Sequence, residues 1–131
     1  MPKQINPFLM FEGRAEEAMT FYTSTVKNSR IVNIDRYGPE GPGPEGSVRL
    51  ARMTIAGLEV MCIDSPGKHA FTFTPATSFF VECESADELD ALYAALSEGG
   101  EVMMPPDNYG FSRKFTWIGD RFGVSWQLNW A

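Results

Sequence analysis

The residues best placed for chemistry lie near the end of the chain, where polar and apolar side chains alternate. Val124, Trp126, Leu128 and Trp130 take one set of alternate positions, and Ser125, Gln127 and Asn129 take the other. Period-two alternation predicts a strand with one face in a core. The other face is polar but uncharged, which suits the wall of a pocket better than open solvent. We therefore expect Gln127 to face a ligand cavity.

Two titratable side chains are further candidates. Glu82 alternates with Ser78 and Phe80 along a predicted strand, so it belongs to the same face as a cavity, where burial would suit a general base. A solvated carboxylate close to the start of the next helix explains Glu82 better. His69 lies in the break at 65–69 and is best interpreted as a linker residue. Because it is the only histidine, a two-histidine metal site within one chain is excluded.

Composition restricts the class of protein. The chain has 131 residues, of which 44% are hydrophobic and 21% charged, as expected of one globular domain. The net charge is −6 and the basic residues are scattered, which argues against a nucleic-acid partner. No segment approaches the roughly 20 apolar residues of a membrane span and the first residues form no apolar run, so we expect a cytoplasmic protein without membrane contact. Cys62 and Cys83 stand in apolar runs and are predicted to be buried thiols.

The elements that must position these residues repeat. In the first half we predict strands at 5–11, 31–37, 47–55 and 58–64, with a helix from Ala15 after the first strand. In the second half we predict strands at 78–83, 101–104, 113–118 and 124–130, with a helix that begins at the capping box Ser85 to Glu88 and ends at Gly99. A loop rich in proline and glycine fills 38–46. The chain is therefore expected to contain two βαβββ modules, at about 3–66 and 70–131.

The predicted fold is α+β, with paired βαβββ modules forming curved mixed sheets. Each helix would cover the outer face of its sheet and leave the concave face open, a usual place for a ligand. Alternation assigns residues of several strands to this cavity face: Asn6, Phe8, Met10, Glu59, Met61, Ser78, Phe80 and Glu82. The aromatic residues Phe8, Phe80, Trp117 and Trp126 fit a core better than a stacking platform for a planar ligand, which is the alternative. Arg36 and Tyr37 fit either an anion-binding pair or an exposed strand end.

Several motifs resemble a known family. They are Asn6-Pro-Phe-Leu-Met-Phe-Glu-Gly-Arg-Ala-Glu-Glu-Ala-Met, Arg36-Tyr-Gly with the glycine-proline loop after it, and Asp120-Arg-Phe-Gly-Val-Ser-Trp-Gln. Together with the repeat they resemble the PhnB-like branch of the vicinal oxygen chelate superfamily, also called the glyoxalase, bleomycin resistance and extradiol dioxygenase superfamily. Members of this branch often carry a demethylubiquinone 3-methyltransferase-like label. The resemblance implies a homodimer, and one exposed sheet edge in each module gives a physical reason for pairing.

The resemblance also implies where a metal would bind. The superfamily positions correspond to Asn6, Met61, Ser78 and Gln127 in this sequence, whereas catalytic members usually have His, Glu or Gln there. Neutral amide and hydroxyl oxygens beside a thioether offset the desolvation of a divalent ion poorly. We therefore predict no metal site and no cofactor.

The sequence favours a small-molecule-binding protein that holds a mostly apolar ligand, with aromatic compounds among the candidates. The predicted ligand-binding residues are Phe8, Met10, Met61, Ser78, Phe80, Trp117 and Gln127. The alternative is an enzyme of the glyoxalase/dioxygenase class or one with demethylubiquinone methyltransferase-like activity, in which Glu82 would act on the substrate. A methyl-donor site of Rossmann type needs a glycine-rich turn between a strand and a helix, and the loop at 38–46 joins two predicted strands instead.

Overall fold

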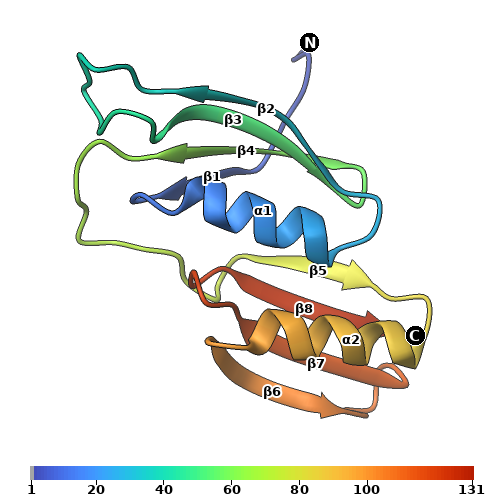
Figure 1. Ribbon diagram of the computed structural model, residues 1–131. Helices are drawn as coiled ribbons and strands as arrows, with labels where there is room; N and C mark the ends of the chain where they lie inside the picture. Colours follow the sequence, from blue (N-terminus) through green and yellow to red (C-terminus); the bar gives the residue numbers. More distant parts are fainter. Residues whose placement is uncertain (1) are drawn as a thin grey trace. The chain divides into compact units, whose positions relative to one another are not determined.

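The computed structural model describes residues 2–131, which form two compact units with a boundary between His69 and Ala70. Each unit has the element order βαβββ, which confirms the predicted fold class (Figure 1). The first unit contains β1 (Phe8–Phe11), α1 (Ala15–Thr25), β2 (Arg30–Arg36), β3 (Val48–Ile55) and β4 (Leu58–Asp64). The second contains β5 (Ser78–Glu82), α2 (Ala86–Ser97), β6 (Glu101–Asp107), β7 (Lys114–Gly119) and β8 (Ser125–Trp130).

Both units build the same four-stranded mixed sheet. The strand order is β1-β4-β3-β2 in the first unit and β5-β8-β7-β6 in the second. The pairs β1–β4 and β5–β8 are parallel, and the remaining neighbours are antiparallel. Each sheet is open and has two edge strands, so the prediction of a single exposed edge in each module was wrong.

The first core lies between α1 and one face of its sheet. Ala18, Met19 and Tyr22 are fully buried on the helix, because their spacing of three and four residues places them on one side of it. They pack over a sheet face that carries Met53 and Cys62, both also fully buried. Burial, with the nearby Asp64 carboxylate, raises the pKa of Cys62 to about 12, which keeps it a thiol.

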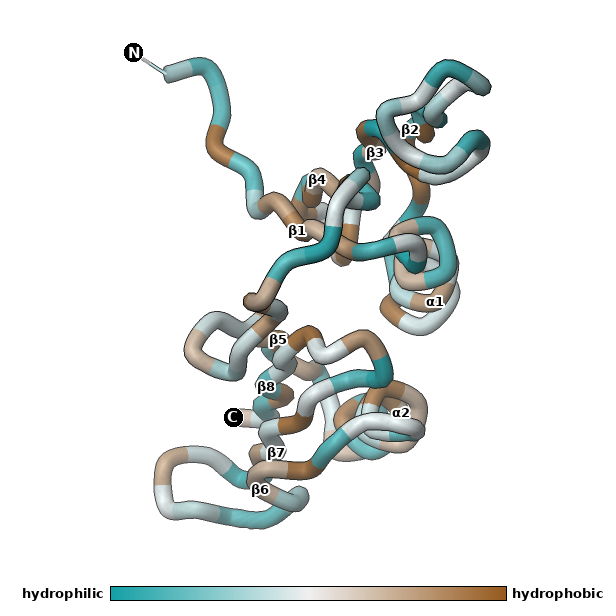
Figure 2. The backbone as a smooth tube through the Cα atoms, turned by 90° about the vertical axis from the view of Figure 1, so that its left-hand side faces the viewer, coloured by the Kyte–Doolittle hydropathy of each residue, from teal (hydrophilic) through white to brown (hydrophobic). Residues whose placement is uncertain are grey.

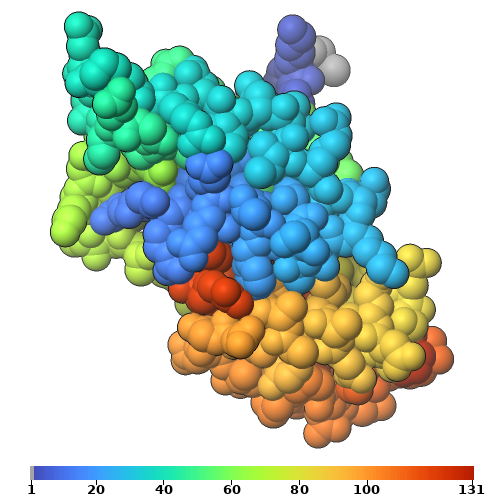
Figure 3. Space-filling view, viewed as in Figure 1, coloured from blue at the N-terminus to red at the C-terminus, as the bar shows by residue number. Residues whose placement is uncertain are grey.

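The second core repeats this plan. Leu89 and Leu96 of α2 are fully buried over Trp126 and Leu128 of β8, while residues on the other side of the helix are exposed. The Phe79 ring contacts the Trp126 ring, with centroids 4.9 Å apart. Figure 2 shows the second sheet nearly edge-on with α2 on one side only, and Figure 3 shows the solvent-facing side of this helix in gold. Val124, Trp126 and Leu128 therefore belong to the core, as predicted, whereas Trp130 is half-buried and has the Arg113 guanidinium over its ring.

The local start and stop signals explain the helix bounds. The Ser85 side chain accepts a hydrogen bond from the Glu88 backbone N–H at 3.1 Å, which confirms the predicted cap of α2.

Within residues 2–131 no helix is both long and apolar enough to cross a bilayer. Between β3 and β4, Ala56 and Gly57 both have positive φ, as a two-residue hairpin turn requires.

Most strand bounds lie within one residue of the sequence prediction, but two differ by three residues. β1 is shorter, because it begins at Phe8 rather than at residue 5. β6 is longer and continues through Pro105 and Pro106 to Asp107. The prolines are tolerated because β6 is an edge strand, where one side needs no backbone donors, and because its pairing with β7 shifts register between Met104 and Asp107.

Each unit contains one buried aspartate that ties backbone segments together. Asp64, only 3% exposed, ends β4 and accepts hydrogen bonds from the backbone N–H groups of Gly13, Ala15 and Val48 at 2.9 to 3.0 Å. This carboxylate fixes the turn into α1 and the start of β3. In the second unit Asp120 plays a related part, because it accepts hydrogen bonds from the backbone of the following turn and from the Trp126 ring N–H at 2.9 Å.

We predict that Asp64→Ala lowers the free energy of unfolding by about 3 kcal/mol, because three backbone N–H donors, two of them buried, lose a charged acceptor. Asp64→Asn should cost less, since one carbonyl oxygen remains. Urea denaturation followed by far-UV circular dichroism measures both values. Asp35→Ala is the control: its carboxylate forms an exposed ion pair with Arg49, so it should cost less than about 1 kcal/mol. Equal costs for Asp64→Ala and Asp35→Ala would contradict this account.

Candidate functional site

The face of the second sheet that α2 does not cover carries the predicted site residues. Directly paired residues of neighbouring strands project from the same face of a sheet. One row across the strands consists of Ser78, Ser125, Gly119 and Glu101, and the next row contains Phe80, Gln127 and Trp117. Ser78, Phe80 and Gln127 therefore share one face, as the alternation predicted, and Trp117, also among the predicted ligand-binding residues, lies beside Gln127.

A polar cluster occupies the middle of this open face. The Trp117 ring N–H donates to Ser125 Oγ at 2.8 Å, and the hydroxyls of Ser78 and Ser125 lie 2.6 Å apart. Gln127 Nε2 donates to Ser78 Oγ at 3.3 Å. Ser125 is only 2% exposed, whereas Gln127 is half-buried. The cluster holds the Gln127 amide and the Trp117 ring in fixed positions beside an open surface.

Aromatic rings continue the same face beyond the polar cluster. Phe115 is buried and contacts Phe80, Tyr109 and Phe111, with ring centroids 5.0 to 6.4 Å apart. The rings of Phe80 and Phe111 are 53% and 62% exposed. An exposed aromatic surface of this kind, next to a few polar groups, can stack against a planar ligand.

The open face of the first sheet has a different character. Phe8 pairs with Met61, and Met61 pairs with Arg52, so the three side chains share that face. Phe8 is 52% exposed. Arg52 forms an ion pair with Glu59, and the Asn6 side chain donates to the Glu59 carbonyl at 3.1 Å. Beside this ion pair, Phe8 and Met61 with the neighbouring Met10 make an apolar strip.

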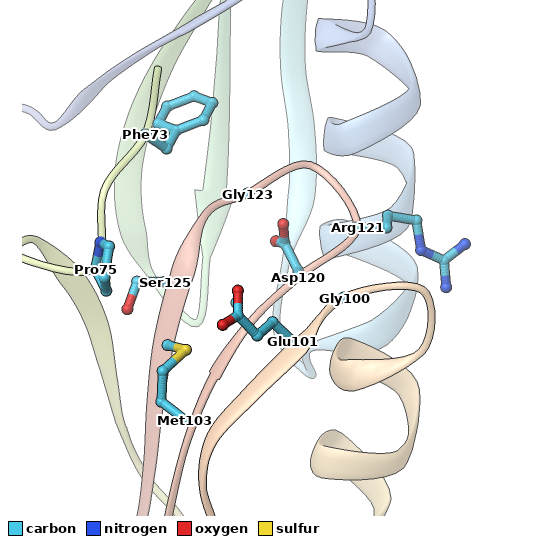
Figure 4. Close-up of a pocket in the computed structure, with 10 residues that line it drawn as sticks. Phe73, Pro75, Gly100, Glu101, Met103, Asp120, Arg121, Gly123 and Ser125 are labelled. Carbon is cyan, nitrogen blue, oxygen red and sulfur yellow. The ribbon is translucent and has the colours of Figure 1, made fainter. Parts of the chain in front are cut away.

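The second unit also contains a pocket that the sequence did not predict (Figure 4). Its volume is about 450 Å³, and it is lined by Phe73, Pro75, Gly100, Glu101, Met103, Gly119, Asp120, Arg121, Gly123 and Ser125. None of the seven predicted ligand-binding residues lines it, but Ser125 belongs to both the pocket and the polar cluster. Alternation places side chains on faces, but it cannot place the loop residues Phe73 and Pro75 over a sheet. A glycine at 119, between Glu101 and Ser125, is the signal that could have indicated a hollow there.

The other candidate residues have local structural partners. Glu82 is exposed and accepts a hydrogen bond from Asn129 Nδ2 at 3.2 Å, so the burial that would suit a general base is absent. His69 Nε2 lies 2.8 Å from Ser65 Oγ in an exposed turn. Arg36 forms two hydrogen bonds with the Glu16 carboxylate, at 2.6 and 2.8 Å, and Tyr37 is buried. The arginine and tyrosine therefore stabilise the first unit.

The residues at the superfamily metal positions do not fit a divalent ion. Ser78 and Gln127 offer neutral oxygens and are hydrogen-bonded to each other, while Met61 offers a thioether beside the Phe8 ring. Over residues 2–131 there is no group of three or more His, Cys, Asp or Glu side chains arranged to hold a metal ion. Carboxylates, imidazoles or thiolates are the ligands such an ion needs. The absence of a metal in the living protein stays a prediction.

Comparison with known proteins identifies the family. The family model described as 3-demethylubiquinone-9 3-methyltransferase matches residues 3–129. The chain belongs to this family. It is 53% identical to the PhnB protein from Bacillus cereus, with a TM-score of 0.95 over 98% of this chain and 100% of that one. The family assignment and this likeness confirm the PhnB-like resemblance inferred from the motifs.

Two further solved structures have a similar fold. Protein PA1353 from Pseudomonas aeruginosa is 28% identical, with a TM-score of 0.84 and 98% of each chain covered. A glyoxylase/bleomycin resistance protein/dioxygenase domain from Frankia sp. EAN1pec is 12% identical, with a TM-score of 0.68 over 100% of this chain and 93% of that one. At that identity the likeness shows the fold alone. The chain is a PhnB-like protein with the glyoxalase/bleomycin resistance fold.

We predict that Ser125→Ala disrupts the polar cluster, because the half-buried Trp117 N–H loses its acceptor and Ser78 loses its closest partner. The loss should lower the free energy of unfolding by about 1 to 3 kcal/mol. It should also shift the Trp117 indole N–H resonance and speed its exchange with solvent. Ser112→Ala, which removes a hydrogen bond of 3.3 Å at the start of β7, is the control. An unchanged indole resonance in Ser125→Ala would contradict the assigned hydrogen bond.

Proposed function

We propose that this protein binds a small, mostly apolar molecule, with planar aromatic compounds as the preferred class. The observation that carries the proposal is the pairing, on one open face, of a fixed polar cluster with exposed aromatic rings. Phe80 and Gln127 are neighbours in the register of β5 and β8, so a ring stacked on Phe80 would lie beside the Gln127 amide. Binding sites for small molecules commonly combine apolar walls with a few fixed polar groups.

The hydrogen bonds already present favour recognition through Gln127. Its amide nitrogen is held by Ser78, and its carbonyl oxygen accepts no hydrogen bond from residues 2–131. That oxygen is a ready acceptor for a ligand hydroxyl or amine. The apolar strip of Phe8, Met10 and Met61 on the first sheet is a second, separate observation in favour of the proposal. Its apolar surface also suits a mostly apolar ligand.

An enzymatic role is the second candidate, and the family description favours it. The description of the family names a methyltransferase that acts on 3-demethylubiquinone-9. In this chain the loop at 38–46 joins the antiparallel strands β2 and β3, whereas a Rossmann-type methyl-donor site needs a strand followed by a helix. Glu82 is a titratable side chain at the end of β5, and it would have to act on the substrate directly.

A thermal-shift screen over aromatic compounds, S-adenosylmethionine, glutathione adducts and divalent metals tests the proposal. A ligand that binds only the folded state raises the unfolding midpoint by mass action. We expect aromatic compounds to raise it, and we expect Phe80→Ala and Gln127→Ala each to weaken that binding by about tenfold, from one lost stacking or hydrogen-bond contact. Gln4→Ala is the control, because that residue is exposed and outside both sheets.

The same screen separates the two candidate functions. Stabilisation by S-adenosylmethionine, or turnover that is lost in Glu82→Gln, would favour the enzyme. Aromatic ligands whose binding is the same in wild type, Phe80→Ala and Gln127→Ala would refute the proposed site.

We also propose that the protein is a homodimer. Each sheet leaves two edge strands with unpaired backbone groups, and such edges favour association with another chain. Sedimentation velocity at micromolar concentration should give roughly twice the mass of the 14.6 kDa chain. A single species of monomer mass at that concentration would refute the dimer.

A further inference from the structure

We propose that the pocket over Gly119 binds a small organic cation, with an ammonium group on the Glu101 carboxylate and an apolar or aromatic body between Phe73, Pro75 and Met103. The inference deepens the proposed function and rests on it, because the pocket opens on the same sheet face and shares Ser125 with the polar cluster. It assigns a chemical class of ligand and residues that neither the family model nor the alternation pattern indicates.

The pocket exists because Gly119 has no side chain. Glu101, Gly119 and Ser125 form one row across β6, β7 and β8, so a side chain at the middle position would fill the space between the other two. A Cβ atom added at Gly119 would meet nothing within 4 Å. At Gly100 the reason for glycine is different, since a Cβ there would lie 2.0 Å from the Gly119 carbonyl oxygen. A side chain at position 119 would therefore meet no steric obstacle, and its absence leaves the pocket open.

Charge inside the pocket favours a cation. Glu101 is exposed, and its carboxylate forms no ion pair or side-chain hydrogen bond with the described residues. In Figure 4 this carboxylate points toward the middle of the lining residues. Asp120 lies beside it with both oxygens already occupied by N–H donors, so it adds negative charge without offering a free contact. An ammonium ion would donate a charge-assisted hydrogen bond to the Glu101 carboxylate.

The one basic residue among those lining the pocket does not oppose this assignment. The Arg121 guanidinium lies 3.7 Å from Glu98, and Figure 4 shows it pointing away from the other lining residues. The remaining walls are apolar or small: a phenylalanine ring, a proline, a methionine and glycines. A volume of about 450 Å³ is ample for a ring with a short aminoalkyl chain.

Three probes of nearly equal size test the class of ligand: 2-phenylethylamine, 2-phenylethanol and 3-phenylpropionate. They differ in carrying a positive, neutral or negative polar end. Binding is measured by titration of the ¹⁵N-labelled protein, followed through backbone amide resonances. We expect the amine to bind about tenfold more tightly than the alcohol, a difference of about 1.4 kcal/mol, and to shift the amides of Gly119, Gly123 and Ser125.

Two variants and a control locate the site. Glu101→Gln should abolish the preference for the amine while leaving binding of the alcohol unchanged. Gly119→Val should weaken both, because the added side chain fills the pocket and a β-branched residue suits a strand. Glu84→Gln removes a second exposed carboxylate outside the pocket and should change nothing. Circular dichroism verifies that each variant is folded.

The outcomes separate this inference from the proposed function. Equal binding of the three probes, tighter binding of the carboxylate, or an amine preference that survives Glu101→Gln would overturn the cation site. So would the absence of any shift at Gly119 and Ser125 up to roughly 10 mM amine. Shifts confined to Phe80 and Gln127 would overturn the inference while supporting the proposed function. Shifts at the pocket that are unaffected by Phe80→Ala would support the cation site even if the stacking site failed.

Discussion

Each sheet in this protein has two faces but only one helix, so one face has no helix over it, and the rest of the structure depends on this constraint. A helix of 11 or 12 residues buries one face of a four-stranded sheet against its apolar side. The other face must then be made acceptable to water or reserved for a ligand. In the second unit it is neither a uniform charged surface nor a second core: it combines a hydrogen-bonded polar cluster with exposed aromatic rings. The fold thus provides a binding surface before any particular chemistry is added.

The buried aspartates show how the open faces can stay rigid without a second covering layer. Asp64 in the first unit and Asp120 in the second each accept hydrogen bonds from turns and from the helix or strands that these turns join. A buried carboxylate is costly unless its oxygens are satisfied, and here each of the two carboxylates accepts at least three hydrogen bonds. Asp120 also orients Trp126 in the core directly beneath the polar face. The position of the site therefore depends in part on the Asp120 carboxylate.

Much of the fold could be predicted from sequence because its signals are local. The alternation at 124–130 assigned Trp126 to the core and Gln127 to the open face, and the capping box at Ser85 fixed the start of α2. The path of β6 through Pro105 and Pro106 could not be predicted, because it depends on β6 being an edge strand. The pocket could not be predicted for a similar reason. Phe73 and Pro75 carry no periodic pattern, yet they line the pocket together with Glu101, Gly119 and Ser125, whose alignment is set by strand pairing. Local sequence patterns predict which face of a strand or helix is buried, whereas a pocket is formed by segments that are distant in the sequence.

The placement of the indole rings gives the two units different optical properties. All three tryptophans, at 117, 126 and 130, belong to the second unit, where one is fully buried and another donates to Ser125. The first unit has Tyr22 and Tyr37 instead, both buried. Intrinsic emission excited at the red edge of the absorption band therefore comes from one half of the chain. Tryptophan emission therefore follows the unfolding of the second unit, which contains the polar cluster. An unfolding step seen by circular dichroism but not by this emission belongs to the first unit.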